Sequence, residues 1–198
     1  MDFNYDDYYR PCHDVVFAIM LADKSLFTRL CSAVYGKPVS IVGEPLSQAV
    51  ARESDVLLNS IRFDVLAVAD ENRIFTLDIQ RRYTQGRQER RGVYYMCRSV
   101  STQKVANMKY EELHPVHIAF ILTDHPDTPS GVRKVGLCYL DTGDIYDDLI
   151  ELVLVYVRTV VKAPPQKGAP EDNDLYIFTR FFAVSSEDEA AAYATEFE

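Results

Sequence analysis

Two stretches of the chain have the apolar spacing of a helix. Across residues 14–35 apolar side chains recur at steps of three and four, and Gly36 and Pro38 follow where a helix should end. We expect a helix there, with a break near Asp23. Residues 87–110 contain no proline and predict a second helix despite Gly92. The stripe that we expect along this second helix is Val93, Cys97, Val100 and Lys104.

Other stretches are typical of strands. Residues 61–69 and 73–80 are rich in β-branched and apolar residues, and a turn-like DEN segment separates them, which predicts a hairpin. Residues 116–122 form an apolar run of buried-strand length. Residues 135–140 predict another strand, and residues 149–161 contain enough β-branched positions to favour a strand over a helix.

The C-terminal part reads differently. Residues 163–174, APPQKGAPEDND, predict a loop, and the final SSEDEAAAYATEFE predicts a solvated helix capped by Ser185 or Ser186. The order helix, strand, strand, helix, strand predicts an α/β (α+β) fold with a mixed central sheet flanked by helices. We expect one main domain at residues 1–162, with residues 163–198 as a loop and acidic segment packed on it or appended to it.

Charge is distributed unevenly along the 198 residues. The net charge of -9 argues against a protein that coats nucleic acid indiscriminately, because such binding needs many Lys and Arg contacts to phosphates. Residues 81–104, however, hold seven basic residues against one acid, a local charge of +6. Residues 171–198 hold eight acids and one Arg. The basic segment is either a solvated helix face or one wall of a local cleft for nucleic acid.

Cysteine spacing and apolar run lengths exclude other classes. The four cysteines lie far apart without a C-x-x-C pair, which disfavours a zinc site and predicts reduced, buried thiols. No apolar run approaches the roughly 20 residues of a membrane span, and the N-terminus lacks the pattern of a secretory signal. We therefore expect a cytoplasmic protein with no membrane partner.

Two acids are embedded in the predicted hairpin. Asp78 lies between apolar residues on the same strand face as Gln80, and Asp64 is embedded in the preceding strand. A connecting loop with an odd number of residues would place Asp64 on that face too, and an even number would separate them. Carboxylates about 5 Å apart repel unless a cation or a shared proton intervenes. A divalent cation is one alternative, and pairing of the acids with Arg62 or Arg73 is the structural one.

The segment RFDVLAVADENRIFTLDIQRR resembles the active-site hairpin of the PD-(D/E)XK nuclease superfamily, and the residues after it resemble its transposase-associated, recombination-promoting branch. In that branch Asp begins the hairpin, Glu-x-Gln ends it, an Arg and paired Tyr open the next helix, and a Gln and a Tyr precede a Leu-x-Pro-Val strand. The matching residues are Asp64, Asp78, Gln80, Arg91, Tyr94, Tyr95, Gln103, Tyr110 and Pro115. The N-terminal HDVVFAIML is similar to the branch's Asp-x-x-Phe helix at Asp14 and Phe17. The likeness runs from about residue 14 to residue 161.

The resemblance implies a restriction-endonuclease-like core and a DNA endonuclease that hydrolyses phosphodiesters with Mg²⁺, for which Mn²⁺ would substitute. Asp64 and Asp78 would hold the metal, and Gln80 would orient the attacking water where Lys stands elsewhere in the superfamily. Asp14 would support the site from outside the ligand set. DNA contacts would come from the second helix, through Arg87, Arg91, Tyr95 and Gln103.

Two departures from the branch keep a second function open. Asp78 stands where the branch usually carries Glu, and Gln80 has no positive charge to stabilise a phosphoryl transition state. The alternative is a catalytically weakened module with a nuclease fold that binds nucleic acid or protein. A homodimer is a candidate assembly for either function.

Overall fold

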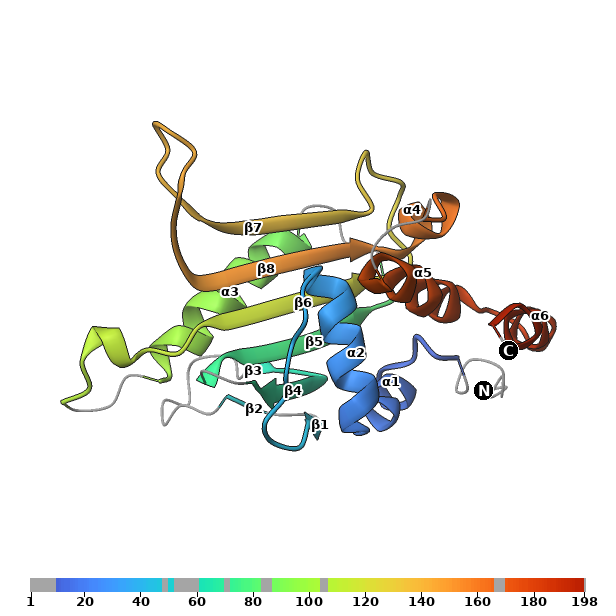
Figure 1. Cartoon of the computed structure of the whole chain (residues 1–198), viewed down its shortest axis with the longest axis horizontal. Helices are drawn as coiled ribbons and strands as arrows, with labels where there is room; N and C mark the ends of the chain where they lie inside the picture. The colour runs from blue at the N-terminus through green and yellow to red at the C-terminus, as the bar shows by residue number, and fades with distance from the viewer. Residues whose placement is uncertain are drawn as a thin grey trace.

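A six-stranded mixed sheet forms the centre of the chain, with strand order β1-β4-β5-β6-β8-β7 (Figure 1). The computed structural model describes residues 10–47, 50–51, 61–69, 72–82, 87–103, 107–165 and 170–197. The strands of the sheet are β1 (Leu46–Ser47), β4 (Val65–Val68), β5 (Ile74–Gln80), β6 (Val116–Leu122), β7 (Val132–Cys138) and β8 (Ile145–Tyr156). The strands β5, β6 and β8 run parallel, while β4 and β7 are antiparallel to their neighbours. Outside the sheet, β2 (Val50–Ala51) pairs with β3 (Ile61–Arg62).

Helices cover both faces of this sheet. They are α1 (Asp14–Met20), α2 (Lys24–Tyr35), α3 (Arg87–Ser101), α4 (Val157–Lys162), α5 (Pro170–Ala183) and α6 (Glu187–Phe197), with a 3-10 turn η3 (Tyr110–Glu112). In Figure 1 α2 lies in front of the sheet and α3 behind it. Phe178 and Phe182 of α5 join the core on the α2 side, and Arg29 of α2 bonds both carboxylate oxygens of Asp174 at 2.7 and 2.5 Å. The predicted mixed sheet with flanking helices, in the order α-β-β-α-β, is confirmed.

The middle strands explain why the core has two halves. On β6 the side chains of Ile118 and Phe120 join the cluster that packs against α3, while Ala119 and Ile121 join the cluster on the α2 side. Side chains of a strand alternate between faces, so a strand that is covered on both sides reads as one continuous apolar run. This is why VHIAFIL predicts its own burial, and all seven of its residues are buried.

The predicted helix break at Asp23 is confirmed. The Asp23 carboxylate accepts the Leu26 N–H at 2.8 Å and caps α2, so the chain restarts a helix after α1 instead of continuing it. Gly36 adopts a left-handed φ of 67° and ends α2 as predicted. At the other end of the chain, Ser186 accepts the Glu189 N–H at 3.2 Å and caps α6, one of the two predicted alternatives.

The second predicted helix is shorter than expected and buries a different stripe. It ends at Ser101, and Tyr110 instead begins η3, while Lys104 lies outside the described residues. Val93 is exposed, because the helix turns another stripe to the sheet: Gln88, Gly92, Met96 and Ser99. A Cβ on Gly92 would lie 2.4 Å from Leu152 Cδ2 on β8. The missing side chain therefore lets α3 approach the sheet, which hydrophobic spacing alone does not reveal.

Other boundaries also differ from the predictions. The predicted strand 149–161 begins earlier and ends at Tyr156, after which α4 forms. Tyr156 is the last residue of β8 that pairs with β6, so beyond it the backbone satisfies its hydrogen bonds within a helix. Within the predicted loop 163–174, α5 already begins at Pro170, a residue suited to the first helical position. Two of the four thiols expected to be buried, Cys97 and Cys138, are exposed.

None of the helices in the described ranges is long and apolar enough to cross a lipid bilayer.

Candidate active site

The hairpin register brings the two embedded acids together. Val65 pairs with Leu77, and continuing that register by one residue places Asp64 opposite Asp78. Five residues separate β4 from β5, so the condition for a shared face is met. The Asp64 carboxylate accepts the Ile79 N–H at 2.9 Å, and the Asp64 N–H donates to the Asp78 carboxylate at 3.3 Å. Each acid is therefore fixed by the backbone of the strand opposite.

The burial and mutual repulsion of Asp64 and Asp78 destabilise the folded state. Asp78 is fully buried and Asp64 half-buried, and among the described residues no group donates to Asp78 Oδ2. Burial raises the pKa of Asp78 well above its ordinary value, the charge of Asp64 raises it further, and the Arg91 guanidinium opposes both. A buried acceptor without a donor costs about 1–3 kcal/mol. The pair is thus poised to receive a cation or to retain a proton.

Arg91 is the basic residue whose charge acts on the acid pair. Its Nη1 donates to Gln80 Oε1 at 2.7 Å and its Nη2 donates to the Tyr95 hydroxyl at 2.8 Å. The guanidinium also lies over two rings, 4.8 Å from the centroid of Tyr95 and 5.4 Å from that of Phe120. Arg91 and Tyr95 are four residues apart on α3, so they are neighbours on one helix face. Gln80 follows Asp78 by two residues on β5 and faces the same side of the sheet.

The aromatic rings that pack around Arg91 and Tyr95 were not predicted from the sequence. Phe63 lies 5.5 Å from Tyr95 between ring centroids, and Phe120 lies 6.0 Å from it, both edge-on. The only sequence signal for these two residues is their membership in apolar strand segments, which says nothing about a site. Together the rings hold the guanidinium in one orientation beside the acids.

Gln103 lies away from the acids. Its amide nitrogen donates to the His114 carbonyl at 3.0 Å, and its amide oxygen accepts the His114 N–H at 2.8 Å. Phe120 is the β6 partner of Asp78, and His114 lies before the first residue of β6, Val116, from which Phe120 is already roughly 13 Å away along the strand. The structure uses this side chain to hold the segment that enters β6, and does not bring it to the acids.

Arg87 and Asp14 are both exposed, and they belong to helices that pack on opposite faces of the sheet. Arg87 is exposed in the first turn of α3, one turn before Arg91. Asp14 is exposed in the first turn of α1. Phe17 and Ala18 of the same helix are buried in the cluster on the α2 side of the sheet, so α1 packs on that side.

The site offers two carboxylates to a metal. In the part of the chain that the structure describes, no three His, Cys, Asp or Glu side chains gather closely enough to hold an ion. Two carboxylates nevertheless suit Mg²⁺, which is typically bound through one or two of them while waters and substrate phosphates complete the octahedron. The buried Asp78 Oδ2 without a donor is an oxygen that such an ion would engage. The residue types at the pair thus fit a divalent cation.

The comparisons with known proteins identify the family. The family described as PD-(D/E)XK nuclease family transposase matches residues 11–192. Searches among curated proteins and among solved structures found no match. The mixed sheet flanked by helices is consistent with a restriction-endonuclease-like fold. With nearly its whole length matched, the chain belongs to the PD-(D/E)XK nuclease family transposases.

Proposed function

We propose that the chain is a metal-dependent DNA endonuclease that hydrolyses phosphodiester bonds, with Asp64 and Asp78 as the metal ligands. The observation that supports this most is the pair itself, because its two carboxylates are locked against opposite strands and one buried oxygen lacks a donor. Such an arrangement costs stability without a cation. In a metal-dependent nuclease, the bound cation would offset that cost.

Each residue at the site has a task that follows from its contacts. When bound, Mg²⁺, or Mn²⁺ in its place, supplies Lewis acidity that makes water a better nucleophile and offsets charge on the phosphate. The backbone N–H groups of Asp64 and Ile79 hold the two carboxylates in place before substrate arrives. The Gln80 oxygen is engaged by Arg91, so its NH₂ group is the half of the amide that orients the attacking water.

Arg91 compensates for the missing lysine of the superfamily motif. Gln80 carries no charge, but its oxygen binds a guanidinium whose charge already acts on Asp78. A preorganised cation at a reacting phosphate stabilises the negative charge that develops in the transition state. We therefore assign Arg91 the electrostatic role and Tyr95 the role of holding it. Asp14, exposed in the first turn of α1, stays our proposed support for the site.

DNA would reach the site along the start of α3. The exposed side chains Arg82, Arg87 and Arg90 lie in the segment that directly follows β5. Phosphate contacts from such residues position the DNA backbone without reading base sequence. Binding should therefore weaken steeply as salt is raised, because released counterions drive it.

Plasmid nicking tests the proposal directly. Supercoiled plasmid is incubated with Mg²⁺ or Mn²⁺ and with wild-type protein, Asp64→Ala or Asp188→Ala, the last a matched control at an exposed acid of α6. We expect nicking that requires the metal, is lost in Asp64→Ala and is retained in Asp188→Ala. Equal cleavage by wild type and Asp64→Ala would overturn the assignment.

The second candidate is a module that binds DNA without cleaving it. The shorter Asp78 and the uncharged Gln80 favour it, since both weaken the usual metal and charge arrangement of the superfamily. It predicts that wild type and Asp64→Ala both retain plasmid DNA in a gel-shift assay while neither nicks it with either metal.

A further inference from the structure

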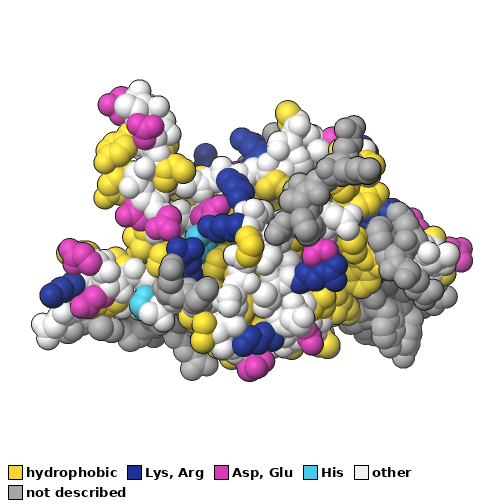
Figure 2. All heavy atoms as spheres, viewed as in Figure 1, with side chains coloured by type: hydrophobic (Ala, Val, Ile, Leu, Met, Phe, Trp, Pro, Cys, Tyr) yellow, Lys and Arg dark blue, Asp and Glu magenta, His cyan; other side chains and the backbone are white. Residues whose placement is uncertain are grey.

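The ribbon formed by the ends of β7 and β8 extends past the rest of the sheet. The first residue of β6, Val116, pairs with Ile150, so residues 145–149 of β8 have no β6 partner. Leu137 pairs with Asp147 and Cys138 with Ile145, after register irregularities in β7. In Figure 1 and Figure 2 this part projects from the body of the molecule. We call residues 137–148 the arm.

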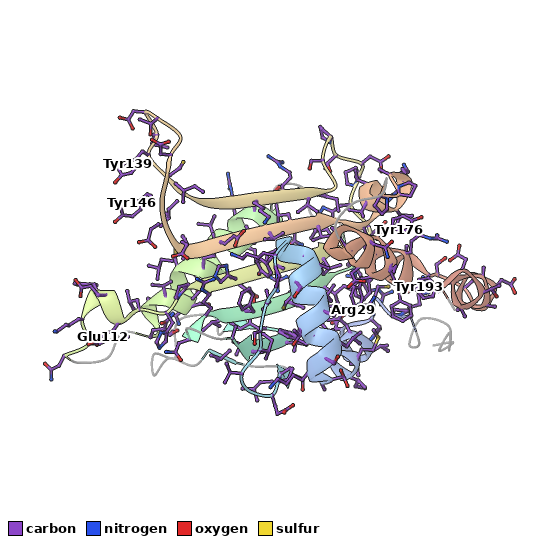
Figure 3. All side chains as sticks on the ribbon, viewed as in Figure 1. Arg29, Glu112, Tyr139, Tyr146, Tyr176 and Tyr193 are labelled. Atoms are coloured by element: carbon purple, nitrogen blue, oxygen red, sulfur yellow. The ribbon has the colours of Figure 1, made fainter. Side chains whose placement is uncertain are left out.

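The arm exposes apolar side chains that a free monomer would be expected to bury. Four of its large side chains are 53 to 98% exposed: Tyr139, Leu140, Ile145 and Tyr146. The rings of Tyr139 and Tyr146 meet edge-on with centroids 5.5 Å apart, and both stand out from the ribbon in Figure 3. A two-stranded ribbon is marginally stable alone in water, and clustered exposed apolar groups mark interaction sites.

Charge restricts what covers the arm. Its acids are Asp141, Asp144, Asp147 and Asp148, and it has no Lys or Arg. Figure 2 shows acidic side chains at the tip and at the base of the projecting part, with hydrophobic side chains between them. Two arms would repel each other, so arm-to-arm pairing is disfavoured. The complementary surface must combine positive charge with apolar or aromatic groups.

The chain carries such a surface on α3. Its outer face has exposed residues at steps of three and four, namely Arg87, Arg90, Tyr94 and Cys97, with Val93 beside them. We call these residues the α3 stripe. We propose that the arm of one copy docks on the α3 stripe of a second copy. Each copy offers one arm and one stripe, so a two-fold pair exchanges arms and satisfies both surfaces. Because Arg87 and Arg90 also belong to the surface proposed to meet DNA, a docked arm covers part of it.

Assembly of the full chain tests the proposal without any assay of nuclease activity. Sedimentation velocity across the micromolar range should show a monomer–dimer equilibrium. Leu140→Ser and Ile145→Ser should each weaken it at least about tenfold. Ile19→Ser changes an apolar residue of α1 that is 70% exposed, and should leave the equilibrium unchanged. Wild-type protein that stays monomeric at every concentration, or equal weakening by all three variants, overturns the proposal.

A charge exchange and a crosslink test which surface receives the arm. Arg90→Glu should weaken the dimer, and adding Asp144→Lys should restore it, because the pair of charges is then reversed. A short bismaleimide should link Cys97 of one copy to Cys138 of the other, since both thiols are exposed. Loss of the crosslink in either Cys97→Ser or Cys138→Ser supports the docking. A crosslink that survives either change, no crosslink at all, or a double variant that stays weak contradicts it.

Discussion

Replacing Arg91 by glutamine should slow cleavage by about 10²–10³-fold and leave a protein that still folds. The substitution removes two charge-assisted hydrogen bonds, at 2.7 Å to Gln80 and 2.8 Å to Tyr95, together with the stacking over Tyr95 and Phe120. Because the guanidinium is half-buried, we expect a loss of about 1–3 kcal/mol in the free energy of unfolding. Loss of one preorganised donor at the reacting phosphate costs about 10²–10³ in rate.

The assay is single-turnover cleavage of a labelled duplex at saturating metal and enzyme, with urea unfolding measured in parallel. Arg91→Lys keeps the charge, but a lysine lacks the forked guanidinium that bonds Gln80 and Tyr95 at the same time. The cleavage rate of this variant should therefore lie between the rates of wild type and Arg91→Gln. Lys37→Gln removes an equal charge from an exposed position after α2 and serves as the control. A folded Arg91→Gln protein that cleaves within a factor of a few of wild type would refute the electrostatic role.

Combining substitutions at Arg91 and Gln80 distinguishes two explanations of what Gln80 does. If Gln80 acts mainly by holding the guanidinium, then Gln80→Ala should slow cleavage but add little to Arg91→Gln, because one unit is already broken. If Gln80 acts only on the attacking water, the two losses should multiply. The single and double variants measured under the same conditions decide between these outcomes.

Two further predictions concern the scaffold. Gly92→Ala should destabilise the protein by about 1–3 kcal/mol in urea unfolding, since its Cβ would meet Leu152. Adding Leu152→Ala should recover part of that loss. If alanine destabilised the protein only through its effect on the backbone of α3, Leu152→Ala would not recover it. Burial on its own raises the pKa of Glu151, but the hydrogen bond from His117 at 2.9 Å and the charge of Lys134 hold it below its ordinary value. The stability that Glu151 contributes is therefore complete at neutral pH and lost as pH falls through its depressed folded-state pKa. The advantage of wild type over Glu151→Gln should shrink between about pH 5 and pH 3, and an advantage that grows on acidification would contradict this.

Local rules reduced the placement of the two acids to one open question, which was whether the loop between their strands has an odd or an even number of residues. Alternation along a strand and the parity of a loop fix which side chains share a face, and both hold for Asp64 and Asp78. The same rules place Gln80 on that face. The shared face of Asp78 and Gln80 therefore follows from the chain alone, while the position of Asp64 required the observed five-residue separation of β4 and β5.

The same local rules could not predict contacts between helices and strands. The bond from Arg91 to Gln80 depends on how α3 crosses the sheet, which Gly92 sets through its approach to Leu152. The resemblance implied that Gln103 contacts DNA, and the structure adds a contact that the motif does not reveal, the pair of hydrogen bonds between its amide and the backbone of His114. Helix spacing identified α3 but not its buried stripe, since a glycine has no side chain to count.

Asp78 is the residue at which the proposed function conflicts most directly with stability. A fully buried carboxylate beside a second acid, with no donor to Oδ2 among the described residues, is a defect by every rule of core packing. Asp78→Asn keeps the oxygen that accepts the Asp64 N–H and removes the charge. We expect it to raise the free energy of unfolding at neutral pH by about 1–2 kcal/mol while it abolishes nicking. Loss of both stability and nicking in Asp78→Asn would instead mean that the carboxylate supports the fold, and the conflict between fold and function inferred here would not exist.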